Sequence, residues 1–121
     1  MSLFTSTQVI NDGTADHTFV LRGQIPNPKS LVSEYFEPDA MSKESKIQAR
    51  YENNNSPAQR SVLTSTCLLP DADGVLKKCT INTSVAYDKK CDIADVEDRM
   101  DLHLAAFAIP GARTRFLQRM P

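Results

Sequence analysis

The sequence lacks the features that mark membrane, secreted and many catalytic proteins. No apolar run approaches the roughly 20 residues that cross a bilayer, and residues 1–5 lack the charged-then-apolar layout of a signal peptide. A phosphate-binding loop, an HExxH zinc motif and a nucleotide fingerprint are also missing. We therefore expect a cytosolic protein with no membrane partner, no cofactor and no metal site.

An excess of charge is absent too. The 121 residues include 14 basic and 15 acidic ones, which gives a net charge of -1. Overall charge therefore does not attract nucleic acid, and any RNA binding must come from a basic face that is balanced by acidic residues elsewhere. The length and the hydrophobic share of 40% predict one ordinary globular domain over residues 1–121.

Cysteine and histidine are too few and too scattered to indicate an active site. Cys67, Cys79 and Cys91 show no CxxC or Cys/His spacing, and an odd number of cysteines in a cytosolic chain favours free thiols. His17 and His103 are not spaced from a cysteine, serine or carboxylate as in a triad or metal site. We expect no enzyme, and a small enzyme that uses one of the cysteines is the least favoured alternative.

The most regular part of the sequence is a pair of strands around a polar loop. Period-two alternation predicts strands at 46–51 and 62–69, and the residues between them at 53–60 predict the loop of a long antiparallel hairpin. In the first strand the odd-numbered residues are apolar and the even-numbered ones polar. One face suits a core, and the other suits a polar ligand.

A second hairpin is predicted in the first 23 residues. Asn11-Asp12-Gly13 lies between two β-prone runs, and Asn and Gly accept the positive φ of tight turns. Pro26 and Pro28 remove backbone donors, so they favour a connection over a strand. The elements expected here are strands at 4–10, 17–22 and 31–36, a connection at 23–30 and a polar turn at 39–44.

The last third of the chain predicts one long strand and then helices. After a turn at 71–74, residues 75–87 alternate as a strand, and from Cys91 onward apolar residues recur every three or four positions, as in an amphipathic helix. Asp92 is the expected N-cap, and the acidic residues after it suit the helix dipole better than a metal ion. Pro110-Gly111 ends this helix, and 112–120 predicts a short second one with Arg113, Arg115 and Arg119.

This order predicts an α+β fold, in which an N-terminal hairpin (1–23) and an antiparallel sheet (31–87) precede C-terminal helices (92–120). A polar sheet face can hold phosphates and read unstacked bases, although a plain solvated face is the alternative. A one-residue register shift would instead turn Ser61, Leu63 and Ser65 to that side. The candidate RNA-binding residues are Lys46, Gln48, Arg50, Thr64, Thr66, Lys78, Thr80 and Asn82.

Ser56-Pro57-Ala58-Gln59-Arg60 resembles the Ser-Ala-Gln-Asn-Arg turn in the coat proteins of single-stranded RNA bacteriophages. The turn at 11–13 and residues 75–108 resemble the same regions of that family. Thr80-Ile81-Asn82 stands where the family carries Tyr-Leu-Asn or Tyr-Ala-Asp, so Asn82 keeps a hydrogen-bonding group while Thr80 lacks the stacking ring.

The resemblance implies a homodimer in which the C-terminal helices of each subunit cover the partner's sheet. It further implies assembly in the bacterial cytoplasm into an icosahedral virion shell around genomic RNA, with the polar sheet face inward. Binding of an operator hairpin and repression of replicase translation are also implied. The alternative is a dimeric cytosolic RNA-binding regulator that forms no shell.

Overall fold

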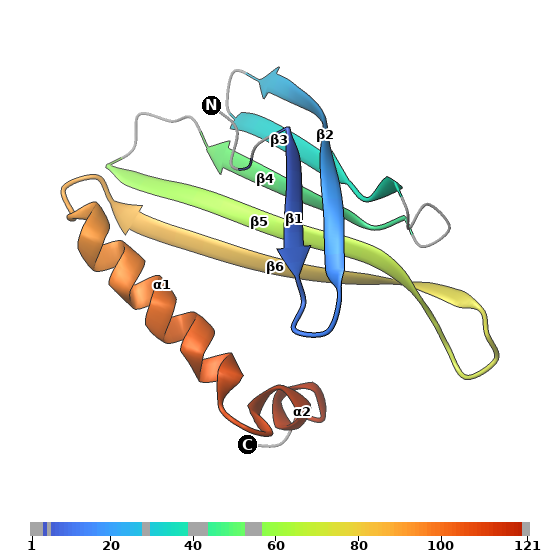
Figure 1. Cartoon of the computed structure of the whole chain (residues 1–121). Coiled ribbons are helices and arrows are strands. Elements are labelled where there is room, and N and C mark those ends of the chain that lie inside the picture. Colours follow the sequence, from blue (N-terminus) through green and yellow to red (C-terminus); the bar gives the residue numbers. More distant parts are fainter. Residues whose placement is uncertain (1–3, 5, 28–29, 39–43, 53–56, 120–121) are drawn as a thin grey trace. The chain divides into compact units, whose positions relative to one another are not determined.

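Figure 1 shows a computed structural model of the chain, which describes residues 4, 6–27, 30–38, 44–52 and 57–119. The chain divides into two compact units, Met1–Ala86 and Tyr87–Pro121. The first unit holds a sheet, and the second holds the helices.

The sheet has six antiparallel strands that neighbour one another in chain order. Pairs of consecutive strands therefore form hairpins, and alternate side chains of each strand lie on opposite faces. The strands are β1 (Thr7–Asn11), β2 (Asp16–Asn27), β3 (Ser30–Phe36), β4 (Lys46–Glu52), β5 (Ala58–Pro70) and β6 (Leu76–Asp88).

The core lies on the sheet face that carries the odd-numbered residues of β4. Tyr35 and Ala49 are 0% and 2% exposed there. The β1–β2 hairpin crosses this face in Figure 1, and its Phe19 lines a small cavity together with Ile47 of β4 and Ile81 of β6. The hairpin thus supplies a lid over part of the apolar face.

Tyr35 also anchors the N-terminal segment. Its hydroxyl donates to the backbone oxygen of Phe4 and accepts from the backbone nitrogen of Phe4, each at 3.0 Å. The two rings lie 5.1 Å apart in a tilted arrangement. A buried hydroxyl therefore has its hydrogen-bond partners, as a fully buried tyrosine requires.

The connection predicted at 23–30 is wrong over most of its length, because β2 continues to Asn27, β3 begins at Ser30, and the two strands pair through Pro26↔Leu31. The pairing of β1 with β2 ends at Thr7↔Val20. Among the described residues, β2 beyond Leu21 pairs only with β3, so it is an edge strand there, where a proline is tolerated because one side of the strand makes no ladder bonds.

The loop predicted at 53–60 is shorter than expected at its end, since β5 begins at Ala58. The early start of β5 brings it into contact with β6, the strand on the side away from β4. There Arg60 Nε donates to Ser84 Oγ of β6 at 3.1 Å. The polar turn predicted at 39–44 and the rest of that loop lie mostly outside the described residues.

The turn predicted at 71–74 is confirmed. Asp71 accepts from the backbone nitrogens of Asp73 and Val75 at 2.9 and 3.0 Å, and Gly74 has a φ of 80°. A positive φ favours glycine at this position. The last strand, β6, differs by one residue from its predicted bounds at each end.

The second unit contains α1 (Ile93–Ala108) and α2 (Ala112–Leu117). The predicted N-cap is confirmed, because the Asp92 side chain accepts from the Ala94 backbone nitrogen at 3.0 Å. Phe107 and Phe116 join the two helices edge to face, with ring centroids 5.3 Å apart. The prediction of Arg119 in the second helix is wrong, since α2 ends at Leu117 and Arg119 has a φ of 57°.

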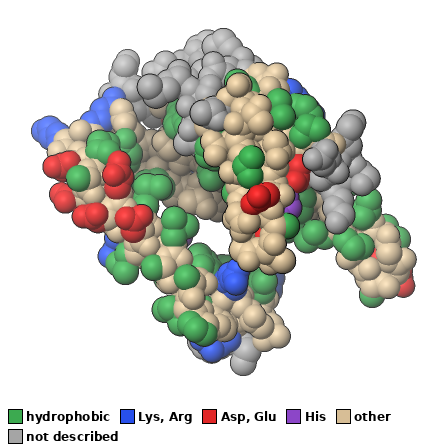
Figure 2. Space-filling model, viewed as in Figure 1, with side chains coloured by type: hydrophobic (Ala, Val, Ile, Leu, Met, Phe, Trp, Pro, Cys, Tyr) green, Lys and Arg blue, Asp and Glu red, His purple; other side chains and the backbone are tan. Residues whose placement is uncertain are grey.

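The surface of α1 is divided by side-chain type. Acidic side chains gather over its first turns (Figure 2), near the positive end of the helix dipole. No side chain described in α1 or α2 is buried. The apolar stripe of α1 consists of Ile93, Val96, Met100, Leu104 and Phe107.

Candidate nucleic-acid interface

The register between β4 and β5 decides which side chains share the polar face. Gln48 pairs with Thr64 and Lys46 pairs with Thr66, and directly opposed residues of antiparallel strands lie on one face. The alternative register, with Ser61, Leu63 and Ser65 on the polar side, is therefore excluded. The predicted residues of β4 and β5 form one continuous polar surface.

A hydrogen bond extends this surface to β6. Thr64 Oγ1 donates to Asn82 Oδ1 at 2.7 Å, so Asn82 lies on the same face as Thr64. Lys78 and Thr80 follow by alternation along β6. We call the combined surface the polar face, and it comprises Lys46, Gln48, Arg50, Thr64, Thr66, Lys78, Thr80 and Asn82.

The polar face leaves donors available to a ligand. The oxygen of the Asn82 amide accepts the Thr64 bond, so its two N–H groups can donate to a base or phosphate. Arg50, Lys78 and Thr80 are exposed, and the Lys46 side chain is 45% exposed. The arrangement can bind phosphates through cations at its margins and bases through amides and hydroxyls between them.

Three residues that the sequence did not single out adjoin the polar face. Glu34 pairs with Gln48 and Phe36 pairs with Lys46 in the β3–β4 register, which places both side chains on this side. Arg22 joins them from β2, because its guanidinium lies over the Phe36 ring. The polar face therefore continues toward the N-terminal edge of the sheet.

Carboxylates on this side moderate its charge. Glu34 Oε1 lies 3.9 Å from Arg22 Nη1 and 3.7 Å from Lys46 Nζ. A second pair joins Glu52 to Arg60 at 3.6 Å. These contacts hold cations in place on an exposed surface, where each ion pair contributes little to stability.

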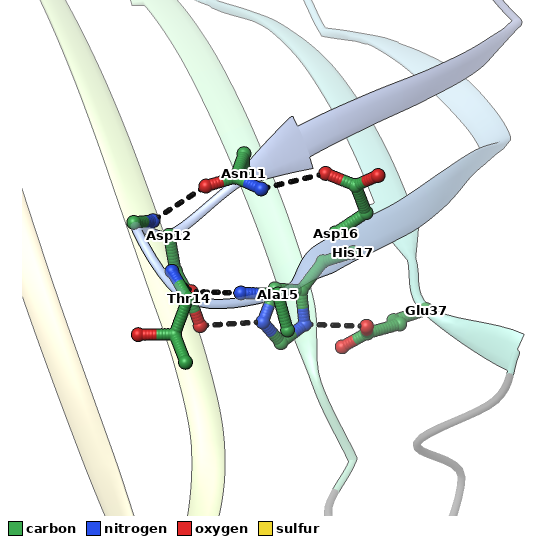
Figure 3. Close-up of polar contacts among 8 residues, drawn as sticks. Asn11, Asp12, Thr14, Ala15, Asp16, His17 and Glu37 are labelled. Atoms are coloured by element: carbon green, nitrogen blue, oxygen red, sulfur yellow. Dashed lines mark hydrogen bonds and ion pairs between the residues drawn. The ribbon is translucent and has the colours of Figure 1, made fainter.

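A separate cluster of titratable groups surrounds His17 at the β1–β2 turn (Figure 3). Nδ1 of His17 lies 2.6 Å from Glu37 Oε2, and Nε2 lies 2.8 Å from Asp12 Oδ2. Both ring nitrogens face an acceptor, and only the imidazolium can donate from both. The cluster ties the turn to the end of β3.

These contacts shift two pKa values. Hydrogen bonding to Asp12 and then to Glu37 raises the pKa of His17 above 6.5. The Ala15 backbone N–H, the His17 ring and the Thr14 backbone N–H lower the pKa of Asp12 to about 2. The carboxylates of Asp12 and Glu37 lie on opposite sides of the ring and do not converge on a point. Accordingly, no group of His, Cys, Asp and Glu able to hold a metal ion occurs among the described residues.

The remaining candidates for chemistry are the cysteines and His103. Cys67 and Cys79 are half-buried and Cys91 is exposed, and these three described cysteines carry no disulfide. His103 is exposed on α1, with its ring 5.8 Å from that of Phe107. Within the described part of the chain, no helix is both long and apolar enough to cross a membrane.

No protein-family model and no curated protein matches the chain. Solved structures do match it. The virus-like particle of Beihai levi-like virus 21 matches with a TM-score of 0.65 and 17% identity over 96% of this chain and 94% of that one. The chain has the levivirus coat-protein fold. The particle of bacteriophage AVE019 matches with a TM-score of 0.63 and 9% identity, covering 93% of each chain.

A third structure agrees with this fold. The virus-like particle of bacteriophage GQ-907 has a TM-score of 0.60 and 16% identity, and the match covers 97% of this chain and 92% of that one. The levivirus coat-protein fold confirms the α+β class predicted from the sequence, with a six-stranded antiparallel sheet followed by two helices. It also confirms the resemblance on which that prediction partly rested.

Proposed function

We propose that the chain is the capsid protein of a small single-stranded RNA bacteriophage, with a structural rather than catalytic role. One observation carries this proposal: the fold matches chains of three virus-like particles over 92% or more of every chain involved. In this proposal the sheet unit and the helical unit act together as one coat-protein domain. The protein assembles in the cytoplasm of the bacterial host and resides in the virion.

The helical unit supports a homodimer within this proposal. Leu104 in the apolar stripe of α1 is 61% exposed, and Ile81 on the apolar side of β6 is 63% exposed. Apolar side chains as exposed as these two are typical of surfaces that bind another protein. We propose that the helices of each subunit cover the apolar sheet face of the partner, and that such dimers build an icosahedral shell.

The polar face supports the RNA partner. Its cations suit phosphates, and its hydroxyls and amides suit the edges of unpaired bases. We propose that Lys46, Arg50 and Lys78 contact phosphates of the genomic RNA. We further propose that Gln48, Asn82 and the hydroxyls of Thr64, Thr66 and Thr80 contact the bases of an operator hairpin, through which the dimer represses replicase translation.

Electron microscopy of the protein expressed alone in bacteria tests the capsid proposal. We expect uniform round particles, and an absorbance ratio at 260 and 280 nm that shows nucleic acid inside them. Sedimentation of the same sample should place the material far above a dimer. A dimer at every concentration, with no particles, would contradict the capsid proposal and favour the RNA-binding regulator.

A further inference from the structure

Arg22 occupies an irregular position in the sheet. The β2–β3 register shifts between Leu21, which pairs with Tyr35, and Gly23, which pairs with Glu34. Arg22 is therefore the extra residue of a β-bulge. Bulges bend a strand and redirect a side chain, and they often lie beside functional sites. The side chain of Arg22 is 57% exposed.

The guanidinium of Arg22 is held on two sides. Its central carbon lies 4.5 Å from the centroid of the Phe36 ring, and Nη1 lies 3.9 Å from Glu34 Oε1. The aromatic ring holds the guanidinium through a cation–π contact, and the carboxylate approaches one of its nitrogens. The planar cation is thus oriented before any ligand arrives, which reduces the entropy lost on binding.

A second cation lies beside this stack. Lys46 pairs with Phe36 in the β3–β4 register, and its Nζ lies 3.7 Å from the same oxygen of Glu34. Two cations therefore share one carboxylate and leave a net positive charge. Because Lys46 belongs to the polar face, the stack of Arg22 on Phe36 is continuous with the proposed RNA surface.

We propose that Arg22, supported by Phe36, is a stacking platform for an unpaired base of single-stranded RNA, and that Lys46 binds the adjacent phosphate. Guanidinium planes and aromatic rings both stack on bases that are splayed out of a helix. The platform would offset the missing ring at Thr80, whose side chain cannot stack. This inference rests on the proposed function, because it assigns one step of RNA binding to a site outside the predicted residues.

Arg22→Lys separates stacking from charge, because lysine keeps the cation and removes the plane. Fluorescence anisotropy with a labelled short oligouridine strand, on protein freed of nucleic acid, should show about tenfold weaker binding than for the wild type. Affinity for inorganic polyphosphate, which carries charge but no bases, should stay unchanged. Arg99→Lys, the same exchange on the exposed surface of α1, is the matched control and should leave both affinities unaltered.

Phe36→Leu provides a second variant, since it removes the ring and keeps an apolar side chain. It should weaken oligouridine binding to a similar extent, with circular dichroism verifying that the sheet is intact.

Equal affinity of the wild type and Arg22→Lys for oligouridine would overturn the platform alone. An equal loss of oligouridine and polyphosphate affinity would show a charge effect and would also overturn it. A wild-type protein that binds no oligouridine would instead overturn the proposed RNA binding, and the platform with it.

Discussion

The polar face of the sheet and the apolar stripe of α1 are both exposed, but their side chains differ in kind. On the polar face, Thr64 bonds to Asn82, and Glu34 pairs with a cation of β4. On α1, Leu104 and Met100 are exposed, and no described side chain of the helix is buried. A surface whose polar groups bond across strands suits a polar ligand, whereas an uncovered apolar stripe suits a protein partner. Under the proposed function, RNA binding and the assembly contact of α1 therefore lie on different surfaces of the chain.

The largest expected effect comes from placing a charge in the apolar stripe. Leu104→Asp should abolish particles and weaken the dimer about a hundredfold, because an unpaired charge would be buried at the subunit contact at a cost of at least about 2–3 kcal/mol. Analytical ultracentrifugation measures both species. Ala105→Asp is the matched control, since Ala105 is exposed and lies one turn after Asp101 on the acidic side of α1. Particles from Leu104→Asp at wild-type yield would refute the assignment of the stripe to assembly.

A smaller effect is expected from two neighbouring lysines of β6 that lie on opposite faces of the strand. Lys78→Gln should weaken RNA binding and reduce the slope of log affinity against log salt by about 0.7, the value for one phosphate contact on a single strand. Lys77→Gln should leave the slope nearly unchanged, because Lys77 lies on the face opposite to the polar face. A salt titration of RNA affinity measures both slopes. Equal slopes for the two variants would contradict the polar face as the RNA surface.

The smallest effect concerns the turn that Figure 3 shows, which belongs to neither surface. The pKa of His17 is raised in the folded chain by Asp12 and Glu37, so its contribution to stability is complete below about pH 6.5 and is lost as the pH rises through the folded pKa. The pKa of Asp12 is lowered to about 2, so its contribution is present above pH 3.8 and is lost as the pH falls toward 2.

Thermal unfolding of His17→Gln tests this effect. Between about pH 6 and about pH 9, the melting temperature of the wild type should fall more than that of the variant, because glutamine does not titrate. His103→Gln, which alters an exposed histidine on α1, should behave as the wild type. An identical pH dependence in the wild type and His17→Gln would show that the cluster around His17 does not stabilise the fold.

The polar face could be predicted because its information is local. Strict alternation from Lys46 to Arg50 and along β6 fixes which residues share a face, whatever the rest of the fold does. The start of α1 could be predicted for the same reason, because the Asp92 side chain caps the helix by bonding to the backbone of Ala94, only two residues later. The cross-strand match of Gln48 with Thr64 required one further choice of register, which the structure confirms.

The rest depended on contacts between distant parts of the chain. Nothing in the sequence around Arg22 indicates that it is the extra residue of a bulge or that its guanidinium lies over Phe36. A rule based on neighbouring residues alone predicts that Pro26 breaks the strand. Pro26 is tolerated because it lies at an edge of the sheet, and only the full strand pairing defines that edge. His17 meets Glu37 across 20 residues of sequence. Such features arise from tertiary structure, which periodicity does not encode.

Ultraviolet cross-linking of RNA to the purified protein, followed by mass spectrometry of the cross-linked peptides, tests most directly the assignment of RNA to the polar face. We expect cross-links on peptides of β4, β5 and β6 that contain Lys46, Thr64 or Asn82, and on the β2 peptide that contains Arg22. Peptides of α1 and α2 should carry almost none. Cross-links concentrated on the helical unit, with the polar face unmodified, would contradict the account.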